Sequence, residues 1–200
     1  MSRKDISSEC LYAPDIKTTH SFFVDGDVDD SLIGRGLQMD RLNYQEGYFG
    51  IAIRILDLIR MSNNNAIKDS YIYVSLFCFR HFLELSMKDT IIHYYNKKEE
   101  ASSIIRNSGH NLISLYNELS KLPGVHSDDV SKTVSNMLNT IQGYDPTGTV
   151  FRYPYRVNEN GIIEPINRRH IGLKNIRVLK TRMMQLYNYF DGINSMICSY

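Results

Sequence analysis

The chain has 200 residues, of which 42% are hydrophobic and 22% charged, and its formal net charge is +1. This composition is that of an ordinary globular domain and excludes extensive disorder. The near-zero net charge gives no global sign of a nucleic-acid or membrane partner, although a local basic patch is compatible with it. The longest apolar stretch, 71–79, is far shorter than the roughly 20 residues that span a bilayer, so we expect no membrane segment.

Two features of the chain indicate a cytoplasmic protein. The N-terminal sequence MSRKDISSEC lacks the apolar segment of a secretion signal. The three cysteines, Cys10, Cys78 and Cys198, are far apart and have no metal-ligand spacing. We therefore expect a cytoplasmic protein with reduced thiols and without a metal ion or other cofactor.

The first part of the chain predicts an arm followed by a helical domain. Residues 1–38 show no sustained helical period, so we expect a partly extended N-terminal arm, and the helical domain at 39–200. The first helix is predicted to begin near Asp40, as its N-cap, and to end at the polar run 62–65. Apolar residues three and four positions apart place one face on this helix, formed by Tyr44, Tyr48, Ile51, Ile55 and Leu58.

The second helix is predicted from about Tyr71 to Tyr95, with Asp69 or Ser70 as its cap. Its first half is apolar nearly all round, so we expect it at the centre of the core. A charged patch and a short segment that ends at Arg106 follow it.

Three further helices are predicted at about 111–121, from a cap at 127–129 to Gly143, and at about 173–197. The segment 144–167 reads as a hairpin or extended excursion, with a tight turn at Asn160-Gly161. The last helix carries an apolar seam, which is typical of antiparallel packing in a bundle or of pairing with a second chain. The seam consists of Ile176, Leu179, Met183, Leu186, Phe190, Ile193 and Ile197.

A charged stripe on the second helix is the first candidate site. Arg80, Glu84 and Lys88 recur at every fourth position and therefore share one helix face, with His81 beside them. On so apolar a helix, a charged stripe must either reach a groove or be paired internally. The sequence leaves both a functional face and a structural ion pair open.

Two other segments carry candidate site residues. His110 follows a glycine turn at the start of a helix, where it can cap a helix or act as an acid or base. The segment FRYPYR (151–156) interleaves Arg152 and Arg156 with aromatic residues such as Tyr153. This pattern suits phosphate and base contacts, and it equally suits a strand whose rings pack on the bundle.

Basic residues also gather around the start of the last helix. Arg168, Arg169 and His170 precede it, and Lys174, Arg177, Lys180 and Arg182 follow. Cations at a helix start are unfavourable with the helix dipole, so their presence indicates an anionic partner. A solvated basic face is the alternative.

The segments 79–91 (FRHFLELSMKDTI), 109–119 (GHNLISLYNEL) and 151–156, followed by a long closing helix, resemble the HEPN superfamily over residues 42–198. Glu84 and Lys88 match the polar residue and basic partner of the family's second long helix, and His110 matches the His of its His-x-Leu element. The resemblance implies an all-α, HEPN-like bundle of four to five helices with a small β-hairpin excursion before the last helix. The chain lacks the family's ribonuclease motif, an Arg and a His separated by four to six residues near the last helix.

The resemblance implies a protein of a defence or toxin–antitoxin system that binds or acts on RNA or a nucleotide, possessing at most a metal-independent ribonuclease activity. It also implies a homodimer. The catalytic candidates are His110, Arg152, Glu84 and His170. The substrate-binding candidates are Arg80, Lys88, Tyr153, Arg156 and Arg169. The alternative is a non-catalytic helical interaction module that binds a partner protein.

Overall fold

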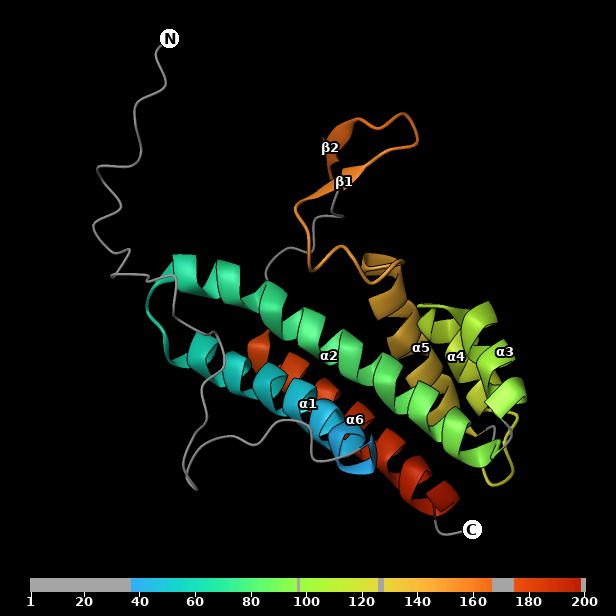
Figure 1. The fold of residues 1–200 in the computed structure, drawn as a ribbon. Helices are drawn as coiled ribbons and strands as arrows, with labels where there is room; N and C mark the ends of the chain where they lie inside the picture. Colours follow the sequence, from blue (N-terminus) through green and yellow to red (C-terminus); the bar gives the residue numbers. More distant parts are fainter. Residues whose placement is uncertain (1–36, 97, 126–127, 167–174, 199–200) are drawn as a thin grey trace, which may run out of the picture. The chain divides into compact units, whose positions relative to one another are not determined.

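The computed structural model describes residues 37–96, 98–125, 128–166 and 175–198. These residues form six α-helices and one two-stranded antiparallel hairpin. In chain order (Figure 1) the elements are α1 (Leu37–Met61), α2 (Asn65–Tyr94), α3 (Lys98–Ser108), α4 (Leu112–Leu119), α5 (Asp129–Tyr144), β1 (Tyr155–Val157), β2 (Ile163–Pro165) and α6 (Ile176–Cys198).

The predicted fold class is confirmed in its coarse form, since the chain is mostly helical with a small hairpin before the last helix. The expected number of four to five helices is wrong, because the segment after α2 forms the additional helix α3. Glu99 and Glu100 lie in the first turn of α3, where negative charge complements the helix dipole. The predicted arm at 1–38 lies outside the described residues, apart from positions 37 and 38, which begin α1.

The start of α2 is set by a side-chain cap. The carboxamide oxygen of Asn64 accepts a hydrogen bond from the backbone N–H of Ala66 at 2.9 Å. This cap places the helix start earlier than the expected caps, Asp69 and Ser70, which lie inside the helix. The polar run 62–65 was predicted only as the end of the first helix, but its Asn64 also caps the start of α2.

The starts of the other helices agree better with the sequence. The predicted cap of α5 is confirmed, because the carboxylate of Asp128 accepts a hydrogen bond from Ser131 N–H at 2.8 Å. Asn111 caps α4 in the same way. Helix α1 begins at Leu37, three residues before the expected start at Asp40.

Helix α2 is the centre of the bundle. It packs against α1 and α6 along its length and against α3 and α4 at its C-terminal part, while α5 packs on α4 (Figure 1). The seam of α6 faces this core: Met183, Leu186, Phe190, Ile193 and Ile197 are buried, and its first two members, Ile176 and Leu179, pack partly buried against the same core. The seam therefore packs against other helices of the same chain, and it does not support the predicted pairing with a second chain.

The expected packing faces of α1 and α2 need correction. Of the predicted face of α1, Tyr44, Ile51 and Leu58 are exposed, whereas Ile55 is buried and Tyr48 packs partly buried against the core. The core residues that the prediction missed are Phe49, Ala52, Leu56 and Ile59. Apolar residues surround much of α1, so their spacing alone was compatible with either of two faces packing into the core. On α2 it is the second half that is most buried, because Tyr71 and Val74 in the first half are exposed.

The hairpin pairs β1 with β2 in antiparallel register, so that Arg156 lies opposite Glu164. The predicted turn is confirmed, since Gly161 has φ +75°, in the left-handed region that glycine adopts without strain. In the part of the chain that the structure describes, no helix is long and apolar enough to cross a membrane.

We predict that Leu83→Ala lowers the free energy of unfolding by about 2–5 kcal/mol, because Leu83 is fully buried and its truncation leaves a cavity. Leu58→Ala is the matched control, because Leu58 is 53% exposed, and it should change stability by no more than about 0.5 kcal/mol. Urea denaturation measures both values. Equal losses in the two variants would show that the core is placed wrongly.

Candidate functional site

The charged stripe of α2 is organised around the buried side chain of Arg80. One terminal nitrogen of its guanidinium lies 3.2 Å from a Glu84 carboxylate oxygen, and the other donates to the His110 carbonyl at 2.7 Å. Its Nε donates to the Asp145 carbonyl at 3.2 Å and lies 3.4 Å from the Asp145 carboxylate. Arg80 therefore ties α2 to the loop before α4 and to the end of α5.

Asp145 and Gly148 hold the turn after α5 against Arg80. Asp145 ends α5, and its fully buried carboxylate accepts the backbone N–H of Val150 at 2.9 Å. Gly148 has φ +74°, and a Cβ at this position would come within 2.8 Å of a terminal nitrogen of Arg80. The backbone conformation and the close approach both require glycine here.

Glu84 connects this buried network to the surface. One of its oxygens accepts a hydrogen bond from Lys88 Nζ at 2.7 Å and lies 2.8 Å from His110 Nδ1. The carboxylate side chain is only 5% exposed, whereas the His110 ring is 65% exposed. Between the two tautomers of the imidazole, a carboxylate at Nδ1 favours the one with the proton on Nδ1, which has Nε2 as the acceptor.

The surroundings of Glu84 keep it ionised. Burial alone raises the pKa of Glu84, but the hydrogen bonds from Lys88 and His110, together with the Lys88 charge, outweigh this effect. The net result is a pKa below the ordinary value of 4.5. At neutral pH the carboxylate therefore holds Lys88 and His110 in place.

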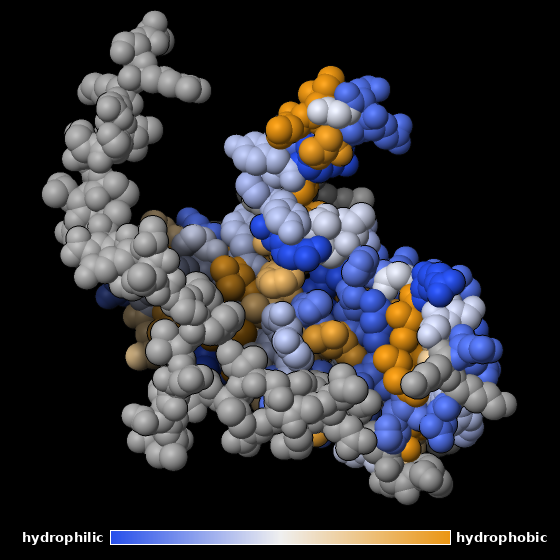
Figure 2. All heavy atoms as spheres, viewed as in Figure 1, coloured by the Kyte–Doolittle hydropathy of each residue, from blue (hydrophilic) through white to orange (hydrophobic). Residues whose placement is uncertain are grey.

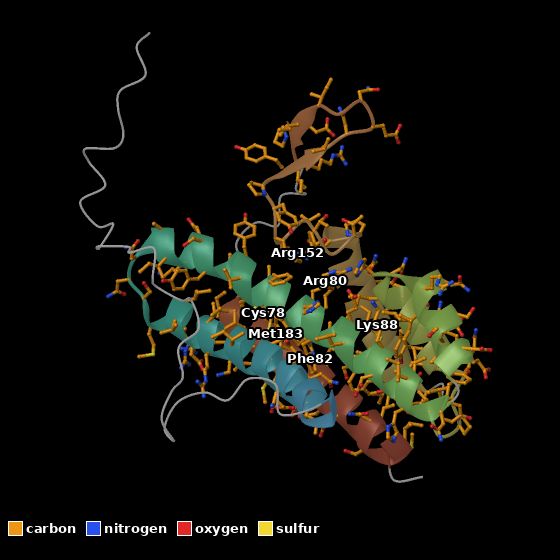
Figure 3. The ribbon with its side chains drawn as sticks, viewed as in Figure 1. Cys78, Arg80, Phe82, Lys88, Arg152 and Met183 are labelled. Atoms are coloured by element: carbon orange, nitrogen blue, oxygen red, sulfur yellow. The ribbon has the colours of Figure 1, made fainter. Side chains whose placement is uncertain are left out.

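Arg152 lies in the turn that Arg80 and Asp145 support. Its Nε donates to the Gly148 carbonyl at 2.9 Å, and its guanidinium lies 5.6 Å from the ring centroid of Phe77 and 5.2 Å from that of Tyr153. Figure 3 shows Arg152 and Arg80 beside the middle of α2, with Lys88 further along the helix. Among the described residues no carboxylate pairs with Arg152, so its positive charge is available at the surface.

The structure brings together most of the predicted site residues. Arg80, Glu84, Lys88 and His110 form one connected network, which Gly148 links to Arg152. Arg80 itself is buried with its donors engaged, so it positions the site and leaves substrate contact to more exposed groups.

The remaining candidates do not join this network. Arg156 pairs with Glu164 across the hairpin at 2.6 Å and is exposed. Arg169 and His170 lie outside the described residues. Of the predicted basic surface on α6, Lys180 pairs with Asp57 at 2.7 Å beside a pocket of about 340 Å³ between α1 and α6.

Three further residues of the site were missed in the sequence or noted only in passing. Asp145 and Gly148 lie in an Asp-Pro-Thr-Gly turn, whose composition signals a turn but not its contact with Arg80. His81 is half-buried beside the Tyr48 and Phe77 rings. Burial lowers the pKa of His81, and the nearby cations, Arg152 first among them, lower it further against the opposing effect of Glu84.

In the described ranges no group of three or more His, Cys, Asp or Glu side chains is placed to hold a metal ion. No protein-family model matches the chain, and no curated protein or solved structure is significantly similar to it. The resemblance to the HEPN superfamily therefore rests on the quoted motifs alone.

We predict that Glu84→Gln lowers the free energy of unfolding at pH 7 by about 3–5 kcal/mol, because it removes one partner of a buried ion pair. A carboxylate with a lowered pKa stabilises the fold above its unfolded-state pKa, and this stabilisation is lost as the pH falls through the folded-state value. The difference between wild type and variant should therefore shrink below about pH 4.5.

Denaturation of both proteins between about pH 7 and about pH 3 measures this difference. Glu118→Gln is the control, because Glu118 pairs with a well-exposed lysine, Lys121, and such pairs contribute about 0–1 kcal/mol. A difference for Glu84→Gln that stays constant across the range would contradict the assigned ionisation.

Proposed function

We propose that this chain is a HEPN-like helical domain that binds RNA in a defence or toxin–antitoxin setting. We further propose that it is a metal-independent ribonuclease in which His110 is the general base and Glu84 orients its ring. The observation that carries the proposal is the contact between the buried Glu84 carboxylate and the exposed His110 ring at 2.8 Å. A carboxylate that orients an imidazole at Nδ1 and leaves Nε2 toward solvent is a recurrent arrangement for proton transfer.

The proposed chemistry uses the 2′-hydroxyl of RNA as the nucleophile. His110 Nε2 takes the proton of the 2′-hydroxyl while the O2′–P bond forms and the P–O5′ bond breaks. The leaving 5′-oxygen takes a proton from His170 or from water. Arg152 neutralises the charge that develops on the phosphate oxygens, and Lys88 adds positive charge beside Glu84.

The bundle and the charge distribution support the same proposal. Glu84 and Asp145 neutralise Arg80 inside the protein, whereas Arg152 keeps its charge at the surface. A phosphodiester is the polyanion that such a surface recognises. The absence of the usual Arg-to-His spacing means that the catalytic pair proposed here differs from that of the family's ribonucleases.

We predict that the purified chain cleaves a mixed pool of single-stranded RNA in the presence of a chelator, and that His110→Ala and Arg152→Ala each reduce the rate by about 100-fold or more. His93→Ala and Arg182→Ala are matched controls, because these residues are exposed on α2 and α6 away from the site. Gel electrophoresis of labelled RNA measures cleavage. No cleavage by wild type, with unchanged thermal midpoints in both site variants, would contradict the proposal.

A non-catalytic interaction module is the second candidate, and the hairpin is the observation that favours it. Val157, Ile162 and Ile163 are exposed there, and Figure 2 shows hydrophobic residues on its surface. Exposed apolar side chains gathered on one small element are typical of a protein-binding surface. Because the α6 seam is buried, the homodimer expected from the sequence would have to use another surface, and we propose the hairpin.

We predict that the chain forms a dimer at micromolar concentration and that Ile163→Asp weakens the dimer at least tenfold, because a buried charge opposes apolar contact. Val130→Asp, at another exposed position at the start of α5, is the control. Light scattering over a dilution series measures the mass. A monomeric wild type would exclude the homodimer, and a dimer unaffected by Ile163→Asp would place its interface elsewhere.

A further inference from the structure

A row of aromatic rings crosses the surface from α1 to α2. Tyr44 stacks on Tyr48 with ring centroids 6.4 Å apart, and Tyr48 contacts the His81 ring edge-to-face at 4.5 Å. The His81 ring lies parallel to that of Phe77 at 5.8 Å. Helix α1 thus contributes the first two members of a continuous row, and α2 contributes the next two.

The turn before β1 extends this row. The Arg152 guanidinium lies over the ring of Phe77, and Tyr153 lies on Arg152 in turn. The row therefore continues as ring, cation and ring beyond α2. Its order from one end to the other is Tyr44, Tyr48, His81, Phe77, Arg152 and Tyr153.

Burial distinguishes this row from the aromatic core. Phe79 and Phe82 are buried in the core, whereas Tyr44 is 62% exposed, Tyr153 is 51% exposed and Arg152 is exposed. The middle members, such as His81, are half-buried and join α1 to α2. Packing accounts for the middle of the row, but it does not account for large rings at both exposed ends.

The chemistry of the row fits unpaired nucleobases. Bases stack on aromatic rings and on guanidinium planes, and successive stacking groups with a nearby cation are the usual platform for single-stranded nucleic acid. Burial and neighbouring cations hold His81 in its neutral form at pH 7, so its ring adds stacking surface. His81 also lies one turn from Glu84 on the same face of α2, so the row runs beside the proposed catalytic pair.

We propose that these six residues form a binding track for the bases of single-stranded RNA that leads to Glu84 and His110. The inference rests on the proposed function, because it assumes an RNA ligand, and it adds that the ligand is unpaired. Bases inside a duplex are stacked on each other and cannot reach such a track. The track therefore selects single strands over duplexes of the same charge.

Fluorescence anisotropy with a short labelled RNA tests the track on the whole chain. We expect tight binding of the single strand, and at least tenfold weaker binding of the same sequence as a duplex and of a strand with abasic positions. Tyr44→Ala and Tyr153→Ala should each weaken single-strand binding about 5- to 150-fold, the range for loss of one stacking ring. Tyr44→Phe and Tyr153→Phe should restore binding, because they keep the ring.

Tyr155→Ala and Tyr71→Ala are the controls, since both tyrosines are exposed and lie outside the row. Equal affinity for single strand and duplex, or alanine variants that bind like wild type, would overturn the track and leave the proposed function standing. Absence of RNA binding and cleavage by wild type would overturn the proposed function itself. All tested tyrosines are exposed, and thermal midpoints that match wild type confirm that the variants are folded.

Discussion

The buried guanidinium of Arg80 is the interaction on which the site depends. An isolated cation in a protein core is costly, so its surroundings must supply charge and hydrogen-bond acceptors. Glu84, Asp145 and the His110 carbonyl supply them from α2, the end of α5 and the loop before α4. One side chain thereby fixes three segments relative to one another, and Gly148 lets the turn after α5 approach it closely.

The same network determines what reaches the surface. Glu84 faces Arg80 with one oxygen and Lys88 and His110 with the other, so the buried pair holds the partly buried Lys88 and the exposed His110. The turn that Asp145 fixes places Arg152 over the ring of Phe77 on α2. A chain with a net charge of only +1 thus has two local cations here: Lys88, which shares a Glu84 oxygen with His110, and Arg152, which lies over the Phe77 ring. The buried ion pairs and the positions of these surface groups therefore depend on one network.

Residue spacing located part of this site and not the rest. Four-residue spacing placed Arg80, Glu84 and Lys88 on one face, because a helix repeats every 3.6 residues. Asp145 is 65 residues away from Arg80, and no local pattern relates the two. The edge-to-face contact between His81 and Tyr48 was likewise not predictable from spacing, because Tyr48 belongs to another helix.

The sequence by itself determined the helical class, the hairpin turn at Gly161, the cap of α5 and the shared face of the charged stripe, because these depend on neighbours within a few residues. Only the tertiary structure decided which face of α1 enters the core, that the α6 seam packs within the chain, and that Arg80 is paired internally. Periodicity indicates which residues share a helix face. Whether that face is buried depends on segments that are distant in the chain. Their packing selects one face where the pattern alone allows several.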